Sequence, residues 1–269
     1  MKVVRDFVRP PSGKGASVAL GLFDGLHIGH RQVLEAALHS GELAPCVFTY
    51  TISSQIPQNK KNYSTLMPDE QKCALLEQMG FEMVVMPEFD SFKDVEPREF
   101  VERMLIEGMG ARELNIIQPV LLDGKPVSST RIRQAILDGR MDDASRMLGR
   151  RFCIRLKVEH GNQIGRMLDF PTINQVFPRF HIVPRYGVYS TIVNIDGKLY
   201  GGVTNVGVKP TVGSDGPLAE TYILDFSGDL YGKTVEVYFF RFVRPERRFE
   251  SIDRLREQIA ADKCSVQEE

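Results

Sequence analysis

The sequence has few of the features that mark secreted, zinc-binding or membrane-spanning proteins. Its four cysteines are scattered, form no C-x-x-C pair and have no histidine at zinc-ligand spacing. We therefore expect reduced thiols and a cytoplasmic location. The first residues contain no long apolar stretch after their charges, so we expect no signal peptide. No apolar run approaches the length that crosses a bilayer, so we expect no membrane partner.

The composition also lacks an excess of charge of one sign. The formal net charge is −1, so no overall field favours nucleic acid or an anionic membrane as a partner. The phosphate-binding sequence G-x-x-x-x-G-K-[ST] is absent, which excludes the common P-loop nucleotide site. The remaining composition is ordinary for a globular protein, 42% hydrophobic and 26% charged, and 269 residues are enough for two domains.

The first half of the chain alternates short apolar runs with longer helix-like segments. The apolar runs end in turn residues and predict buried strands, whereas the longer segments between them predict helices. The predicted strands are 17–22, 46–50, 83–86 and 114–117, and the predicted helices are 31–37, 68–79 and 97–106. This alternation predicts an α/β domain of Rossmann-like form, in which helices cover a parallel sheet.

The pattern changes near Gly149, and we place a domain boundary there, which gives domains 1–148 and 149–269. Beyond it, short alternating strands are separated by regularly spaced turn sequences, which predicts a small antiparallel β-barrel. A final amphipathic helix is predicted over 251–262, with its apolar residues on one face.

A glycine-bearing turn with two histidines follows the first predicted strand. Residues 21–30 read G-L-F-D-G-L-H-I-G-H, with His27 and His30 on either side of Gly29. At the beginning of a helix, free N–H groups and the helix dipole attract phosphate, and histidines can donate to phosphoryl oxygens as charge grows. Gly29 lets a nucleotide approach the backbone. The structural alternative is that one histidine caps the helix and the other lies on the surface.

A second segment has the same phosphate-binding character. Residues 128–133 read S-S-T-R-I-R. The serine and threonine hydroxyls can cap the following helix and bind phosphate, while an arginine clamps it. The alternative is an ordinary N-cap followed by two solvated arginines.

The most informative stretch is 161–174, which reads G-N-Q-I-G-R-M-L-D-F-P-T-I-N. Its glycines allow the backbone to approach an anion closely. Thr172 and Asn174 are two residues apart, so on an extended segment they project from one face. Two neutral oxygens so placed suit a hard cation that bridges phosphates. The alternative is a hairpin turn followed by a polar-faced strand.

This stretch resembles the nucleotide-binding motif of riboflavin kinases, which reads close to G-x-x-x-G-R-x-x-G-F-P-T-x-N. Further pieces of that family's pattern follow in order: Y-G-V-Y at 186–189, G-V-T-N-V-G at 202–207 and A-E-T-Y-I-L-D-F at 219–226. The resemblance implies phosphorylation of riboflavin to FMN by ATP and Mg²⁺. It implies that Glu220 is the catalytic base and that Thr172 and Asn174 hold the metal. It implies nucleotide-binding roles for Gly161, Gly165, Arg166, Pro171 and Asn205.

The turn with two histidines resembles the H-x-G-H signature of nucleotidyltransferases. Together with S-S-T-R-I-R, its F-D-G-x-H-x-G-H form is similar to the adenylyltransferase half of bacterial bifunctional riboflavin kinase/FAD synthetases. The resemblance implies adenylylation of FMN to FAD with release of pyrophosphate, in which His27 and His30 stabilise the α-phosphate. It implies nucleotide-binding roles for Asp24, Gly29, Ser129, Thr130 and Arg131.

The chain departs from that family's pattern in three places. Asp169 stands where a glycine usually precedes F-P-T, and would repel phosphate unless it points away or helps to hold the metal. T-Y-T-I-S at 49–53 replaces the usual P-H-P. Residues 118–124 run almost directly into Ser128, where the family carries G-x-D-F-x-F-G. A segment of the adenylyltransferase domain is therefore missing, and the kinase step is better supported than adenylyl transfer.

Three functions remain open at this point. The first is a bifunctional enzyme that makes FMN and then FAD. The second is a riboflavin kinase whose first domain has degenerated into a scaffold. The third is a non-catalytic flavin-binding sensor, which the combination of Glu220, Thr172 and Asn174 disfavours because simple binding needs no base.

Overall fold

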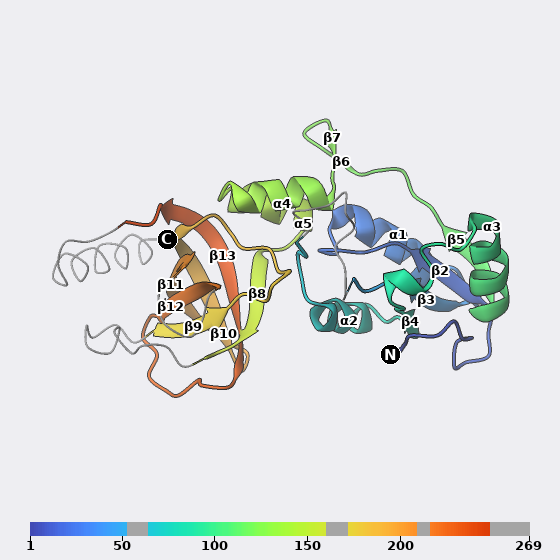
Figure 1. Ribbon diagram of the computed structural model, residues 1–269, viewed down its shortest axis with the longest axis horizontal. Coiled ribbons are helices and arrows are strands. Elements are labelled where there is room, and N and C mark those ends of the chain that lie inside the picture. Colours follow the sequence, from blue (N-terminus) through green and yellow to red (C-terminus); the bar gives the residue numbers. More distant parts are fainter. Residues whose placement is uncertain (53–63, 160–171, 209–215, 248–269) are drawn as a thin grey trace. The chain divides into compact units, whose positions relative to one another are not determined.

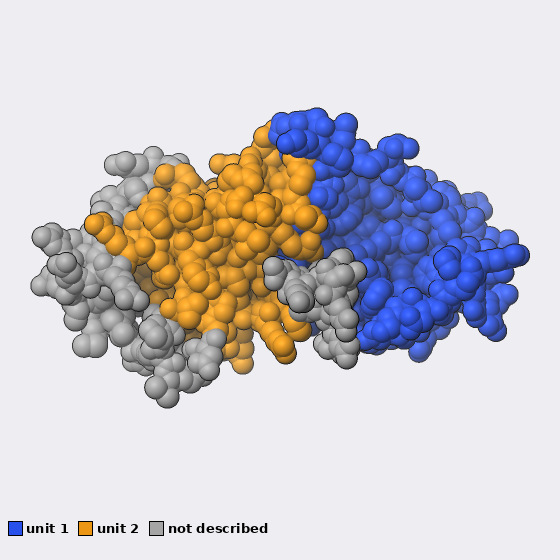
Figure 2. Space-filling view, turned by 45° about the horizontal axis from the view of Figure 1, so that its top comes forward, with its two compact units in different colours: residues 1–129 blue, residues 130–269 orange. Residues whose placement is uncertain are grey.

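The structure is a computed structural model of the chain, with residues 1–52, 64–159, 172–208 and 216–247 described. The chain forms two compact units, Met1–Ser129 and Thr130–Glu269 (Figure 2). The predicted helix at 251–262 lies outside the described residues. No helix within these four ranges is long and apolar enough to cross a membrane.

The first unit is built on a five-stranded sheet in which every pairing is parallel, with the order β1-β4-β3-β2-β5 (Figure 1). Its strands are β1 (Lys2–Val4), β2 (Ala16–Leu20), β3 (Ala44–Phe48), β4 (Met83–Val85) and β5 (Ala111–Asn115). The predicted parallel α/β arrangement is confirmed. The short strand β1 was not predicted, because three residues give too little periodicity to read.

Helices cover both faces of this sheet. They are α1 (Ile28–Leu38), α2 (Asp69–Gln78) and α3 (Pro97–Glu99), which continues as the π-helical stretch η2 (Phe100–Gly108), with a short 3₁₀ turn η1 (Phe89–Ser91) before it. Val47 packs with side chains of α1 and α2, whereas its neighbour Cys46 packs with Leu105 of η2. Successive strand residues thus enter two separate cores, which explains why the strands read as continuous apolar runs.

The second unit contains a curled antiparallel sheet with the order β8-β13-β10-β11-β12-β9. Its strands are β8 (Phe152–Lys157), β9 (Thr172–Val176), β10 (Gly187–Ile195), β11 (Lys198–Val208), β12 (Pro217–Ile223) and β13 (Thr234–Arg244). The two edge strands approach each other at a bridge between Glu159 and Asn174. The fully buried Gln175 amide reinforces this approach, since its Nε2 donates to Leu156 O at 2.7 Å and to Val235 O at 2.9 Å.

Two helices connect the sheets in sequence, α4 (Ser129–Leu137) and α5 (Met141–Leu148), after a small hairpin of β6 (Leu121–Leu122) and β7 (Lys125–Pro126). Except for Ser129, both helices belong to the second unit. There, Gly139 lies against the Phe242 ring of β13, and Arg185 N donates to Ile136 O at 3.2 Å. The two compact units therefore meet about twenty residues before the predicted boundary at 148/149. That boundary refers to the two functional domains and stays a prediction.

Candidate functional site

The predicted phosphate turn connects β2 to α1 through a left-handed stretch of backbone. Phe23, Gly25 and Leu26 have φ values of 53°, 85° and 42°. Glycine adopts such values readily, but for other residues they cost roughly 1–2 kcal/mol each. The backbone of two non-glycine residues, Phe23 and Leu26, is therefore held in a conformation that the surrounding structure must impose.

Side chains from separate elements hold the turn in place. Thr49 Oγ1 donates to Leu22 O at 2.9 Å. The Asp24 carboxylate accepts the Leu66 N–H at 2.8 Å, and its backbone carbonyl accepts from Ser129 Oγ at 2.9 Å. Asp24 is buried, so these bonds are shielded from competing water. The structure thus brings the predicted Ser129 to the predicted Asp24, while Thr130 and Arg131 follow in the first turn of α4.

His27 and His30 stack face to face at the beginning of α1. Their ring centroids are 3.5 Å apart with an interplanar angle of 16°. His27 is the N-cap residue, and its Nδ1 accepts the His30 N–H at 3.2 Å. A Cβ at Gly29 would lie 3.3 Å from the His27 ring, so glycine leaves the space that this ring occupies. The capping alternative is therefore correct for His27, but the second histidine is not a surface residue.

His30 is held in its neutral form. Burial, then the charge of His27, then that of Lys72, lower its pKa to about 3. Its Nδ1 is buried and has no hydrogen-bond partner in the described part of the chain. In the tautomer that carries a proton on Nδ1, the neutral ring can donate one hydrogen bond to a ligand oxygen without carrying a full charge.

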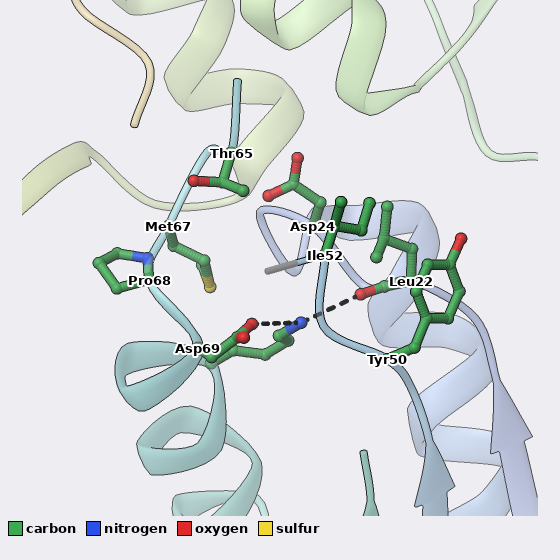
Figure 3. A pocket seen from close by; sticks show the side chains of 9 residues that line it. Leu22, Asp24, Tyr50, Ile52, Thr65, Met67, Pro68 and Asp69 are labelled. Carbon is green, nitrogen blue, oxygen red and sulfur yellow. Dashed lines mark hydrogen bonds and ion pairs between the residues drawn. The ribbon is translucent and has the colours of Figure 1, made fainter. Parts of the chain in front are cut away.

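A cavity of about 140 Å³ opens beside this turn (Figure 3). Its wall combines apolar side chains with two carboxylates and a lysine; the lining residues are Leu22, Asp24, Tyr50, Ile52, Thr65, Met67, Pro68, Asp69 and Lys72. Lys72 was not among the predicted site residues. The signal was available, because Lys72, Leu76 and Met79 recur at the spacing of one helix face and the last two are apolar.

The second predicted site forms a row across three strands of the curled sheet. Asn205 of β11 lies directly opposite Glu220 of β12, and Glu220 lies directly opposite Asn174 of β9. Directly opposed residues project from the same face, with Cβ atoms roughly 4.5–5.5 Å apart. Thr172, two residues before Asn174, shares this face and opposes Tyr222.

The burial of this row distinguishes it from an ordinary solvent-facing set of strand residues. Asn174 is only 9% exposed, while Asn205, Glu220 and Thr172 are half-buried. Within the described ranges, the amide groups of Asn174 and Asn205 make no side-chain hydrogen bond to the protein. Amide groups without protein partners on a largely buried face, as at Asn174, are free to make oxygen or nitrogen contacts to a ligand.

The opposite face of the same strands is a buried hydroxyl ladder. Thr204 bonds with Thr191 at 2.9 Å and with Thr221 at 2.8 Å, and all three side chains are buried. A Cβ at Gly202 would lie 2.9 Å from Thr191 Oγ1, so this position has room only for glycine. The ladder ties β10, β11 and β12 together behind the row that carries Glu220.

Four further predicted residues, Gly161, Gly165, Arg166 and Pro171, lie outside the described residues, as does Asp169. Their predicted roles at the nucleotide stay predictions.

Two protein families match separate parts of the chain. The family described as FAD synthetase matches residues 9–131, which contain the histidine turn and Ser129. The family described as riboflavin kinase matches residues 148–269, which contain the row with Glu220.

Relatives that combine both activities in their names match nearly from end to end. The bifunctional riboflavin kinase/FMN adenylyltransferase of Pseudomonas fluorescens is 33% identical over 294 residues, covering 94% of this chain and 92% of the relative. That of Bacillus subtilis (strain 168) is 30% identical over 283 residues, covering 91% and 90%. Both alignments are longer than this chain of 269 residues, so the relatives contain residues that it lacks. This difference agrees with the prediction that the adenylyltransferase domain of this chain is shortened.

A solved structure shares the fold. The crystal structure of a macrolide-efflux protein from Streptococcus pneumoniae matches with a TM-score of 0.84 and 28% identity, and the match covers 98% of each chain. The likeness therefore includes both units.

We expect the His30 ring to stay neutral where an ordinary histidine takes up a proton. Because its pKa is lowered from 6.5 to about 3, the unfolded chain binds a proton between these values that the native chain does not. This group therefore destabilises the first unit as pH falls, by up to about 1.4 kcal/mol per pH unit. An NMR titration from neutral pH to about pH 4 measures the protonation of the His30 ring. The ring signals are assigned by comparison with His30→Gln, and free imidazole is the reference. A midpoint close to that of free histidine would contradict this expectation.

Proposed function

The chain belongs to the family of bifunctional riboflavin kinase/FMN adenylyltransferases, and we propose that its second unit converts riboflavin to FMN and its first unit converts FMN to FAD. The chain is an enzyme of FAD biosynthesis that combines kinase and nucleotidyltransferase activities. ATP is a substrate of both steps, and FMN is the product of the first and a substrate of the second.

The row of Asn205, Glu220 and Asn174 is the observation that carries the kinase assignment. A carboxylate between two amides, on a surface backed by a rigid hydroxyl ladder, can take a proton without moving far. In the proposed reaction, Glu220 takes the proton of the ribityl 5′-hydroxyl while the oxygen of that hydroxyl attacks the γ-phosphorus of ATP. The bond to the bridging oxygen breaks, and ADP leaves.

The same face offers oxygen donors for a metal ion. The hydroxyl of Thr172 and the amide oxygen of Asn174 would hold Mg²⁺ bound to ATP, since both lie on the face that carries Glu220. When bound, Mg²⁺ would neutralise charge on the phosphates during transfer. The Asn174 amide, buried without a protein partner among the described residues, fits this role.

For adenylyl transfer, the site is the beginning of α1. The free N–H groups there and the stacked pair His27–His30 would face the α-phosphate of ATP. An oxygen of the FMN phosphate attacks the α-phosphorus, the bond to the β-phosphate oxygen breaks, and pyrophosphate leaves. His30, neutral before the substrate arrives, would donate one hydrogen bond to the oxygen on which charge grows.

The proposal also includes the form of the second sheet and the location of the enzyme. We take the curled sheet to be a small β-barrel, supported by the bridge between Glu159 and Asn174. We place the enzyme in the cytoplasm, supported by free cysteines at 46, 73 and 153. Burial raises the pKa of Cys46 to about 12, so its thiol stays protonated and unreactive.

A kinase with a scaffold domain is the second candidate, because both relatives contain residues that this chain lacks. Incubation of the protein with riboflavin, ATP and Mg²⁺, followed by chromatography of the flavins, separates the candidates. FAD indicates the bifunctional enzyme, FMN alone indicates the kinase with a scaffold, and neither product indicates a binding protein.

We expect Glu220→Gln to retain riboflavin binding and to slow FMN formation by about 10²–10⁴-fold, because a neutral amide cannot take the proton. Initial rates of FMN formation and a flavin-fluorescence titration measure the two effects. Asp196→Asn, at an exposed hairpin turn, is the matched control. Turnover of Glu220→Gln close to that of the control would remove Glu220 from this role.

We expect Thr172→Ala and Asn174→Ala to raise the Mg²⁺ concentration needed for half-maximal FMN formation, because each removes an oxygen ligand. Riboflavin affinity should change less than the metal requirement. Thr234→Ala, at an exposed position of β13, controls for loss of a strand threonine. Mg²⁺ titration curves that overlay those of the wild type for both variants reject the metal site.

We expect the double variant His27→Ala/His30→Ala to lose FAD formation and to keep FMN formation, since the two steps use separate units. Loss of the His27 cap should also cost about 0.5–2 kcal/mol of stability, so the assay belongs well below the unfolding temperature. His39→Ala, at the exposed end of α1, is the control. FAD formation by the double variant at the rate of this control would show that the histidines are not needed.

A further inference from the structure

Lys72 is a buried lysine at a position that its own helix does not explain. Its side chain is only 4% exposed, although it lies in the first turns of α2. A positive charge near a helix N-terminus is unfavourable to the helix dipole, and burial of an ammonium group costs solvation. Specific contacts of the ammonium group must therefore account for its place.

Two contacts of the ammonium group define that place, and Figure 3 draws them as dashed lines that end at the labelled residues Asp69 and Leu22. Lys72 Nζ lies 3.0 Å from Asp69 Oδ1, which compensates its charge. It also donates to Leu22 O at 3.4 Å, the carbonyl that accepts from Thr49 as well. Leu22 directly precedes Phe23, the first residue of this turn with positive φ. Two donors on a single carbonyl therefore hold the backbone where the left-handed turn begins.

We propose that Lys72 is a positioning residue for adenylyl transfer, whose ammonium fixes the Leu22 carbonyl and with it the turn that presents His27 and His30. This inference rests on the proposed adenylyl transfer. The turn contains two non-glycine residues with positive φ, so its conformation persists only while the surrounding contacts impose it. Lys72 is the one charged donor among the hydrogen bonds described above for this turn.

The charge of Lys72 gives it a second effect on the same site. Among the described residues, the His27 ring stacks on His30 at 3.5 Å and the Phe23 ring lies at 5.3 Å, while the positive charge of Lys72 acts on His30 electrostatically. That charge contributes to the lowered pKa of His30, after burial and His27. A residue that only filled space in the core would not have this effect.

The test compares Lys72→Met, Lys72→Arg and Lys93→Met in the full-length protein. Methionine retains most of the apolar volume, and arginine retains the charge. Lys93 is the matched control, because it forms the same i,i+3 ion pair with an aspartate, Asp90, but is 41% exposed. FMN formation from riboflavin reports on the second unit in the same sample and checks that each preparation is active.

We expect Lys72→Met to lower kcat for FAD formation from FMN and ATP by at least about tenfold, because small misplacements of reacting groups cost up to about 10²-fold. FMN formation should stay within about twofold of wild type, Lys93→Met should change neither step, and Lys72→Arg should recover part of the loss. The NMR titration should show a higher pKa of His30 in Lys72→Met and not in Lys93→Met.

Two results would overturn the inference, and they differ from failure of the proposed function. FAD formation by Lys72→Met at the rate of Lys93→Met overturns it while adenylyl transfer stands. If NMR shows that the first unit of Lys72→Met is unfolded, the test relies on Lys72→Arg. A folded Lys72→Arg that is as inactive as His27→Ala/His30→Ala then overturns it. Wild-type protein that makes FMN but no FAD removes the proposed adenylyl transfer itself.

Discussion

The backbone between β2 and α1 runs through a left-handed turn, and the histidine site depends on that turn. Phe23 and Leu26 have positive φ without being glycine, at a cost of roughly 1–2 kcal/mol each. Hydrogen bonds from Thr49, Leu66 and Ser129 offset that cost, with Lys72 beside them. These donors come from segments far apart in the sequence, so the site exists only when the whole first unit is folded.

The second unit depends on strand register in a comparable way. Glu220 faces the same side as Asn174 and Asn205 only in the observed pairing, and a slip of one residue would turn it toward the buried ladder. The ladder opposes such a slip, because Thr204 and Thr221 would lose their hydrogen bond and leave buried hydroxyls unpaired. In both units, hydrogen bonds between polar groups determine where the predicted site residues lie.

These two constraints also explain what could be predicted from the sequence. Strands such as β2 and β3 and the position of the histidine turn follow from local patterns, which short segments contain in full. The alignment of Glu220 with Asn174 does not, because it depends on pairing between segments about 45 residues apart. Local spacing could place Lys72 on the buried face of α2, but its contact with Leu22 could not be predicted, because that contact joins two segments across 50 positions. His27 caps α1 and is also a predicted site residue, so the two readings of the histidine pair do not exclude each other.

The predicted deletion between residues 118 and 128 bears on substrate binding more than on the phosphate turn. The donors that hold the turn belong to Thr49, Leu66, Lys72 and Ser129, and none of them lies in the shortened segment. β5 forms an edge of the sheet, with Leu114 and Ile116 exposed next to that segment. Tyr50 and Ile52, which line the cavity beside the turn, lie within the T-Y-T-I-S sequence that stands where P-H-P is usual. They are available to contact the acceptor in the proposed reaction. The predicted shortening can thus leave the proposed phosphate site intact while it changes the surroundings of the acceptor.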